Sequence, residues 1–216
     1  MKVLGIDEAG RGPVIGPLVF AGVMVKEGDE LKLDGIKQAK DSKLIPHKIR
    51  IELDKKIKQN SEYLIISTQP KEIDAALLSD DLNLNWLEAY KQAEIINKLK
   101  PDKAIIDCPS INCKAYEAYL KKLLKNPKII LVVEHKADIN YPICSAASIL
   151  AKVKREQEMD IIKKTYGDTG PGYPANKTTQ EFLKNNWNKY PEIFRQTWST
   201  YKKYSNNKDQ KNLQDY

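Results

Sequence analysis

The sequence has few of the residues on which many metal, redox and membrane sites depend. Its 216 residues include three cysteines (Cys108, Cys113 and Cys144) and two histidines. No C-x-x-C pair occurs, which argues against the common zinc and redox motifs, and the odd cysteine count favours a reducing cytoplasm. No run of eighteen apolar residues is present, so we expect no membrane span. The sequence does not begin with a basic region followed by an apolar run, so we expect no secretory signal.

The glycine-rich stretch "GIDEAGRGPVIGP", from Gly5 to Pro17, lacks the spacing of a nucleotide-binding loop. Its glycines follow G-x-G-x-x-x-G rather than G-x-G-x-x-G, and no G-K-[ST] element follows. The next segment, "VIGPLVFAGVMV", is rich in β-branched residues and predicts a strand rather than a helix. We therefore interpret the stretch as a strand, a tight acidic turn and a second strand.

Basic residues are in excess, with 36 lysines and arginines against 29 acidic residues and a net charge of +7. Such a balance suits a polyanionic partner, most simply a nucleic acid. A generic lysine-rich surface would give the same count, so charge alone leaves both interpretations open.

Strand and helix patterns alternate along the chain, which predicts an α/β domain with a mixed sheet. The final residues from Lys202 are polar and predict a flexible tail. The expected strands are residues 2–7, 17–25, 62–68, 103–107 and 128–135, and the expected helices are 46–60, 82–99, 115–124, 143–166 and two short segments around Phe182 and Phe194.

Acidic residues lie where predicted strands end. Asp7 ends the first strand and Glu8 follows it, Asp107 ends the fourth strand, and Asp138 follows the fifth. Strand ends in an open α/β sheet can converge on a crevice, where unpaired carboxylates repel one another. A hard divalent cation such as Mg²⁺ or Mn²⁺ would relieve that repulsion and could assist phosphodiester hydrolysis. The alternative is that each aspartate caps a turn or helix.

An ordered set of motifs resembles type 2 ribonuclease H (ribonuclease HII) of the archaeal type. The motifs are "GIDEAGRGPVIGPLV", "DSK", "IIDCP", "KAD", "SAASILAKVKRE", "GPGYP" and "FRQTWSTYKK". The resemblance implies a ribonuclease H-like mixed five-stranded sheet flanked by helices, with a C-terminal helical annex. It also implies an endoribonuclease that cuts the RNA strand of RNA–DNA hybrids and cuts at single ribonucleotides in duplex DNA.

The resemblance assigns catalysis and metal binding to Asp7, Glu8, Asp107 and Asp138. It implies Mg²⁺ or Mn²⁺ as cofactor, with two ions during catalysis, and products with a 3′-hydroxyl and a 5′-phosphate. Another metal nuclease or recombinase of this fold class, or a non-catalytic nucleic-acid binding module, are the competing functions. Cys108 is expected to be a small core residue rather than a nucleophile, and His135 to pack or pair locally.

Substrate contacts are carried over from the same motifs. The turn Gly10-Arg11-Gly12 matches the family's reader of the ribose 2′-hydroxyl, and Tyr173 matches the tyrosine that packs on the neighbouring sugar. Arg195 and Trp198 are assigned a structural role in the annex. The remaining expected contacts, to backbone phosphates or from one helix face, are Ser42, Lys43, Ser148 and Lys152.

The expected domain organisation is a catalytic domain over residues 1–166, a helical annex over 167–201 and a flexible tail over 202–216. Near the end of the tail, Gln210, Leu213 and Tyr216 have the Q-x-x-L-x-x-aromatic spacing of peptides that dock on the sliding clamp, proliferating cell nuclear antigen. A disordered terminus with chance spacing is the alternative. We expect a monomer with no membrane partner.

Overall fold

The computed structural model describes the backbone of residues 1–29 and 45–211, and the side chains of these segments as far as Asn206. Its elements follow the alternation expected from the sequence. In chain order they are β1 (Lys2–Ala9), β2 (Leu18–Lys26), α1 (His47–Asn60), β3 (Glu62–Thr68), α2 (Pro70–Leu78), α3 (Leu84–Leu99), β4 (Lys103–Asp107), α4 (Cys113–Leu123), β5 (Ile130–Glu134), α5 (Ala137–Asn140), α6 (Pro142–Tyr166), α7 (Lys177–Asn186), the short 3₁₀ helix η2 (Pro191–Ile193) and α8 (Ser199–Lys211).

The strands form a mixed sheet in the order β3-β2-β1-β4-β5. Strand β1 pairs antiparallel with β2 and parallel with β4, and β4 pairs parallel with β5. Strands β1 and β2 are buried over almost their whole length, which explains their nearly continuous apolar sequences. The predicted five-stranded mixed sheet is therefore confirmed, and the end of its central strand carries Asp7.

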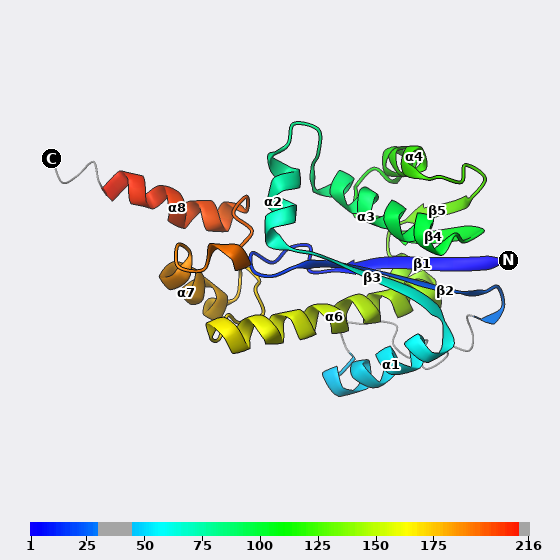
Figure 1. Cartoon of the computed structure of the whole chain (residues 1–216), viewed down its shortest axis with the longest axis horizontal. Coiled ribbons are helices and arrows are strands. Elements are labelled where there is room, and N and C mark those ends of the chain that lie inside the picture. The colour runs from blue at the N-terminus through cyan, green and yellow to red at the C-terminus, as the bar shows by residue number, and fades with distance from the viewer. Residues whose placement is uncertain (30–44, 212–216) are drawn as a thin grey trace. The chain divides into compact units, whose positions relative to one another are not determined.

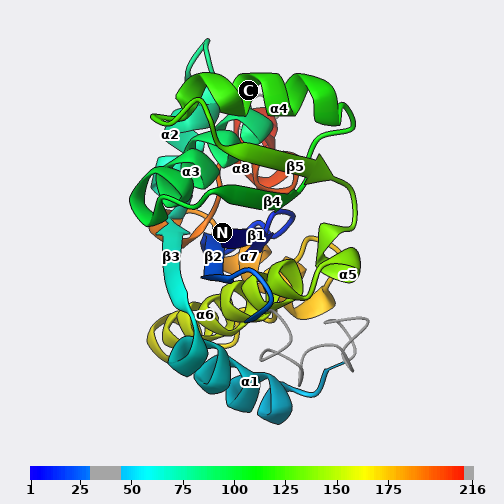
Figure 2. The ribbon, with the colours of Figure 1, turned by 90° about the vertical axis from the view of Figure 1, so that its right-hand side faces the viewer.

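The chain divides into two compact units, and the first contains the sheet. This unit comprises residues 1–9, 19–67 and 83–154. Helices α3 and α4 cover one face of the sheet, and α1 with the first part of α6 covers the other (Figures 1 and 2). Close approach explains two strand glycines: a side chain at Gly5 would collide with the backbone of Ile143 in α6, and one at Gly22 would collide with Ile95 in α3.

The second unit comprises residues 10–18, 68–82 and 155–216. Its core is a cluster of apolar side chains that includes Ile15, Met159, Phe182 and Phe194. Ile15 and Phe194 also form an isolated antiparallel bridge, which joins the turn after β1 to the C-terminal region. The glycine turn of the opening motif is therefore built into the same packed body as the C-terminal segments.

Three local features differ from the sequence-based expectations. Helix α2 was not predicted, the helical segment expected around Phe194 is the short 3₁₀ helix η2 that ends just before it, and α8 continues to Lys211 through the segment expected to be a flexible tail. The division into residues 1–166, 167–201 and 202–216 stays a prediction. The two compact units are made of interleaved chain segments and so do not correspond to these three ranges. Within residues 1–29 and 45–211, no helix has the length and apolar character needed to cross a membrane.

Candidate active site

Three of the four predicted carboxylates converge in the sheet-containing unit. Oxygen atoms of Asp7, Asp107 and Asp138 lie within 4.8 Å of one another. Asp7 lies near the end of β1, Asp107 is the last residue of β4, and Asp138 lies in α5, directly after β5. The parallel pairing of β1 with β4 and of β4 with β5 brings these chain segments to one edge of the sheet.

Asp7 is the most buried member of this group, with 6% of its surface exposed. Burial, opposed by a hydrogen bond from Ser148 and reinforced by the charges of Asp107 and Asp138, raises the pKa of Asp7 from 3.8 to about 7. Without a cation the carboxyl group therefore keeps its proton to a higher pH than an ordinary aspartate does. The mutual repulsion of these carboxylates therefore favours binding of a positively charged ion.

Asp107 is half-buried and experiences the same repulsion. Burial, followed by the charge of Asp138, raises the pKa of Asp107, while backbone hydrogen bonds from Ala137 and Lys136 lower it. The Ala137 amide donates to Asp107 Oδ1 at 3.3 Å. Lys136, at φ 62°, has the left-handed conformation that allows the chain to turn from β5 into α5. This turn places both Asp138 and the amide that orients Asp107.

Glu8 is not part of the three-carboxylate group. It follows Asp7 in β1, where successive side chains point to opposite faces of the sheet, and it is half-buried. Its backbone amide donates to Asp7 Oδ1 at 2.8 Å, so this residue orients Asp7 through its main chain. Direct metal binding by the Glu8 side chain stays a prediction.

Ser148 and Lys152 lie on consecutive turns of α6, as predicted, but their surroundings differ. Ser148 is fully buried and hydrogen-bonded to Asp7, whereas Lys152 is half-buried. The hydrogen bond of Ser148 to Asp7 supports a role in positioning this carboxylate, and the substrate contacts of Ser148 and Lys152 stay predictions. The sequence pattern alone could not distinguish these roles, because both residues share a helix face.

The Gly10-Arg11-Gly12 turn, in the second unit, is held by the buried guanidinium of Arg195. Arg195 donates to the carbonyl oxygens of Gly10 at 2.6 Å, Arg11 at 2.9 Å and Gly16 at 3.0 Å. In a trans peptide the carbonyl and the following N–H point to opposite sides. The N–H groups of Arg11 and Gly12 therefore point away from the guanidinium, and both residues are exposed.

Trp198 supports the same turn. Its Nε1–H donates to the Gly12 carbonyl at 3.2 Å, and its ring lies 4.9 Å from the Arg195 guanidinium carbon. The structural role expected for Arg195 and Trp198 is confirmed. Gly10 itself has φ 90°, a conformation that favours glycine.

Tyr173 lies beside this turn within the second unit. It is 44% exposed, and a Cβ added to Gly12 would lie 4.0 Å from its ring. The buried Arg155 stacks its guanidinium 5.3 Å from the Tyr173 ring and donates to the Pro171 carbonyl at 3.0 Å. Sequence reasoning missed Arg155, although it lies in the "KVKRE" motif, because its role depends on a loop sixteen residues away.

The comparisons with known proteins agree on one family. The sequence model described as Ribonuclease HII matches residues 4–201. The chain belongs to the ribonuclease HII family. Ribonuclease HII of Methanosphaera stadtmanae is 42% identical over 200 residues, covering 92% of both chains, and that of Pyrococcus furiosus is 41% identical over 209 residues, covering 94% of this chain and 91% of the other.

Solved ribonuclease HII structures share the fold. The crystal structure of ribonuclease H2 from Pyrococcus horikoshii OT3 has a TM-score of 0.86 at 38% identity and covers 96% of this chain and 98% of its own. The structure of the PCNA:RNase HII complex from Archaeoglobus fulgidus has a TM-score of 0.82 at 36% identity, with 92% and 96% covered. The predicted archaeal-type ribonuclease HII resemblance and fold are confirmed.

Membership of the ribonuclease HII family makes this chain a metal-dependent endoribonuclease with ribonuclease H activity on RNA–DNA hybrids. Its aspartate cluster suits a hard divalent cation, because the donors are carboxylate oxygens whose burial and mutual repulsion raise the pKa of Asp7 and of Asp107. Four of the predicted contact residues lie outside the described part of the chain, namely Ser42, Lys43, Leu213 and Tyr216. A fifth, Gln210, lies in α8 beyond the last described side chain.

Cys108 directly follows Asp107 at this ribonuclease HII site. Burial, followed by a hydrogen bond with Cys113, raises the pKa of the Cys108 thiol to about 12. In the metal-free protein the thiolate is therefore scarce at neutral pH, which does not suit a nucleophile. The predicted role as a buried small residue is confirmed by its 7% exposure.

Proposed function

We propose that the protein cuts both RNA–DNA hybrids and duplex DNA that contains a single ribonucleotide, leaving a 3′-hydroxyl and a 5′-phosphate. The observation that carries this proposal is the convergence of Asp7, Asp107 and Asp138 within 4.8 Å in a chain of the ribonuclease HII family. A non-catalytic nucleic-acid binder would have no need of three mutually repelling carboxylates.

The proposed cofactor is Mg²⁺ or Mn²⁺, with two ions during catalysis. Asp7, Asp107 and Asp138 would hold the cations, with Glu8 as the further predicted ligand. When bound, such ions would activate a water molecule and stabilise the leaving 3′-oxygen. Ser148 and the Glu8 amide would keep the Asp7 carboxylate in one orientation, so that its oxygens are preorganised before substrate arrives.

Recognition of the ribose is assigned to the Gly10-Arg11-Gly12 turn. Because Arg195 engages the carbonyls on one side, the N–H groups of Arg11 and Gly12 face the other side, where they would donate to a 2′-hydroxyl. Tyr173, held against this turn by Arg155, would pack on the neighbouring sugar. Lys152 is proposed to contact backbone phosphate, as are Ser42 and Lys43.

We also propose that the C-terminal residues dock on a sliding clamp. The support is the spacing of Gln210, Leu213 and Tyr216, together with the existence of a PCNA complex for the Archaeoglobus fulgidus relative. The free cysteines support a cytoplasmic location, where the protein would act as a monomer.

The experiment that tests the proposed function compares three duplexes that differ only in sugar chemistry. These are an all-DNA duplex, the same duplex with one ribonucleotide, and an RNA–DNA hybrid, each with Mg²⁺, with Mn²⁺ and with a chelator. The proposal predicts metal-dependent cleavage of the second and third duplexes only, with a 3′-hydroxyl and a 5′-phosphate at the cut, which mass spectrometry of the products identifies. Cleavage of all-DNA duplex at a similar rate would favour a general metal nuclease instead.

A further inference from the structure

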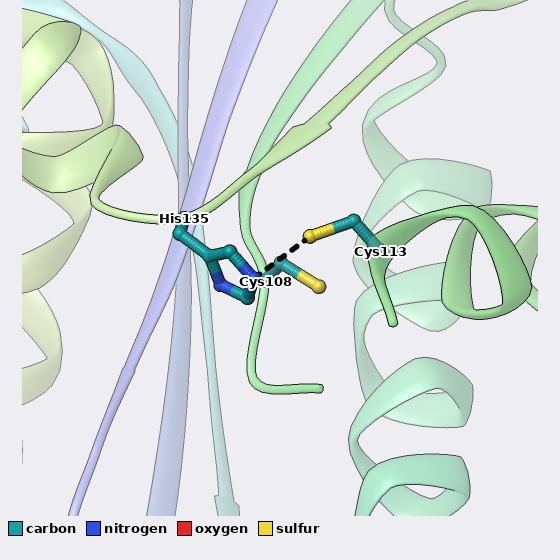
Figure 3. A group of neighbouring side chains, drawn as sticks. All are labelled: Cys108, Cys113 and His135. Carbon is teal, nitrogen blue, oxygen red and sulfur yellow. Dashed lines mark hydrogen bonds between the residues drawn. The ribbon is translucent and has the colours of Figure 1, made fainter. Parts of the chain in front are cut away.

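A second group of potential metal ligands lies in the sheet-containing unit, separate from the carboxylates. The thiol sulfurs of Cys108 and Cys113 and a ring nitrogen of His135 all lie within 4.8 Å of one another. Figure 3 shows these side chains, with the contact between Cys113 Sγ and His135 Nε2 at 3.3 Å. This group contains no oxygen donor, so its chemistry differs from that of the aspartate cluster.

Regular backbone structure places all three side chains. Cys108 directly follows β4, Cys113 is the first residue of α4, and His135 directly follows β5. The Cys108 amide donates to the Glu134 carbonyl at 3.0 Å, which keeps the two strand ends in register. Asn112 caps α4 by accepting from the Ala115 amide at 3.0 Å and so fixes the position of Cys113.

The group lies on the side of the sheet opposite to the carboxylates. Side chains alternate along a strand, and the bond from the Cys108 amide to the Glu134 carbonyl continues the β4–β5 hydrogen-bond pattern one residue past the end of β4. Asp107 and Cys108 therefore point to opposite faces. Cys108 points towards α4, whereas Asp107 joins Asp7 and Asp138.

Sulfur and imidazole nitrogen are the ligands that thiophilic ions such as Zn²⁺ prefer, whereas Mg²⁺ prefers oxygen. In a tetrahedral site with bonds of about 2.0–2.3 Å, ligand atoms are about 3.5–3.8 Å apart. The observed separations, all within 4.8 Å, need only a small side-chain adjustment to reach that geometry. The four-residue gap between the two cysteines also lies within the range typical of zinc ligand pairs, which a search for C-x-x-C overlooks.

We propose that Cys108, Cys113 and His135 bind one Zn²⁺ ion, with water in the fourth position. His135 is exposed and Cys113 is partly exposed, so the ion has a path from solvent. The bound ion would tie the ends of β4 and β5 to the start of α4. Asp107 precedes one ligand and Asp138 lies three residues after another, so zinc would stabilise the two strand ends that carry these carboxylates.

The test uses cobalt as a spectroscopic substitute for zinc. Reduced, metal-free full-length protein is titrated with Co²⁺ in an excess of Mg²⁺, which occupies oxygen sites, and the thiolate-to-cobalt charge-transfer absorption is followed. The wild-type protein should bind one equivalent of Co²⁺ and show this absorption. The absorption should disappear when Zn²⁺ displaces the Co²⁺, and one equivalent of Zn²⁺ should raise the melting temperature of the metal-free protein.

Two variants and three controls locate the ion. Cys113→Ser and His135→Ala should each weaken binding at least about tenfold, because ligand loss costs no less than loss of a supporting contact. Cys144→Ala, His47→Ala and Asp138→Asn should retain the cobalt absorption, since these change the third cysteine, the other histidine and the carboxylate site.

Three results would overturn the proposal. They are the absence of thiolate absorption in reduced wild type, its retention in both Cys113→Ser and His135→Ala, and its loss in Asp138→Asn. Mass spectrometry adds a further check. If the isolated protein contains a Cys108–Cys113 disulfide, and if it still takes up no zinc once this disulfide is reduced, the pair would be assigned to redox chemistry instead. None of these readouts depends on cleavage, so the zinc proposal can fail while the proposed nuclease function stands.

Discussion

The guanidinium of Arg195 donates a 2.6 Å hydrogen bond to the carbonyl of Gly10, although the two residues are 185 positions apart. Arg195 is completely buried and also binds the carbonyls of Arg11 and Gly16. One C-terminal side chain thus determines which way the peptide groups of the N-terminal turn face. The conformation of the proposed ribose reader therefore depends on a completely buried residue from the other end of the chain.

This relationship predicts the effect of Arg195→Lys. Lysine keeps the charge but lacks the planar fork, so it cannot reproduce three separate carbonyl contacts. We expect a loss of at least about 2 kcal/mol in the free energy of unfolding, because hydrogen bonds from a charged group are lost in a buried site. Urea denaturation measures this loss, and Lys203→Arg in exposed α8 is the control.

A milder change separates turn geometry from overall folding. Trp198→Phe keeps an aromatic ring beside Arg195 but removes the Nε1–H bond to Gly12. Its cleavage of single-ribonucleotide DNA should fall more than its stability would explain. Unchanged cleavage in Trp198→Phe and full stability in Arg195→Lys would together contradict the role assigned to this support.

The raised pKa of Asp7 predicts how the stability of metal-free protein depends on pH. Between about pH 4 and pH 7 the folded state retains a proton on Asp7 that the unfolded chain has released. The contribution to stability is therefore greatest below pH 4 and is lost as pH rises through 7, with a slope of at most about 1.4 kcal/mol per unit. Unfolding in chelator at several pH values should reveal this fall.

Asp7→Asn provides the matched comparison, because asparagine has nearly the same shape but does not titrate in this range. Its stability should lack the fall between pH 4 and pH 7 that is due to Asp7. Addition of Mg²⁺ at pH 8 should stabilise wild type more than Asp7→Asn, because the cation binds the deprotonated carboxylates. Identical pH slopes for the two proteins would show that Asp7 is not the titrating group.

The position of Tyr173 beside Gly12 predicts a ring-dependent step in substrate selection. Tyr173→Ala should lower the cleavage rate on single-ribonucleotide DNA, with a loss of up to about 1–3 kcal/mol if stacking contributes as it does on other nucleic acids. Tyr173→Phe should retain most of the rate because the ring is kept. Single-turnover kinetics measures both, and equal losses in the two variants would assign the effect to the hydroxyl rather than the ring.

The tail predicts a partner contact that catalysis does not need. Replacing both Leu213 and Tyr216 by alanine should weaken binding to an archaeal sliding clamp in calorimetry, while cleavage without clamp is unchanged. The matched control replaces Asn212 and Gln214, which lie between the motif positions. Equal clamp affinities for the two double variants would reject the docking peptide.

The strands and strand-end acids could be predicted from sequence because they depend on local patterns. Apolar runs identified β1, β4 and β5, and parallel strand ends must share an edge of the sheet. Asp7, Asp107 and Asp138 therefore follow from sequence once the strands are placed. Direct metal binding by Glu8 does not follow in the same way, since its neighbour Asp7 already points to the site and strand side chains alternate.

Features that depend on distant contacts could not be predicted in this way. The 3.6-residue pattern placed Ser148 on a helix face but did not indicate that its side chain is hydrogen-bonded to Asp7. Helix α8 has a polar sequence, and its first turn is joined to the packed body by Tyr201, whose hydroxyl donates to the Trp187 carbonyl. Helix α2 was missed in the same way. Its buried Asp74 accepts hydrogen bonds from the amides of Gln196 and Thr197, and a contact over this sequence distance leaves no local pattern.

If the aspartate cluster performs metal-dependent cleavage, Asp107→Asn should be almost inactive. The measurement is the single-turnover rate on duplex DNA with one ribonucleotide at saturating enzyme, alongside hybrid affinity and circular dichroism. We predict a rate at least about a hundredfold lower, because the loss of even a supporting contact at a metal site costs up to that much, with affinity and fold retained. The control, Asp160→Asn on the exposed side of α6, should cleave like wild type. A near wild-type rate for folded Asp107→Asn would remove Asp107 from the metal site and contradict the account.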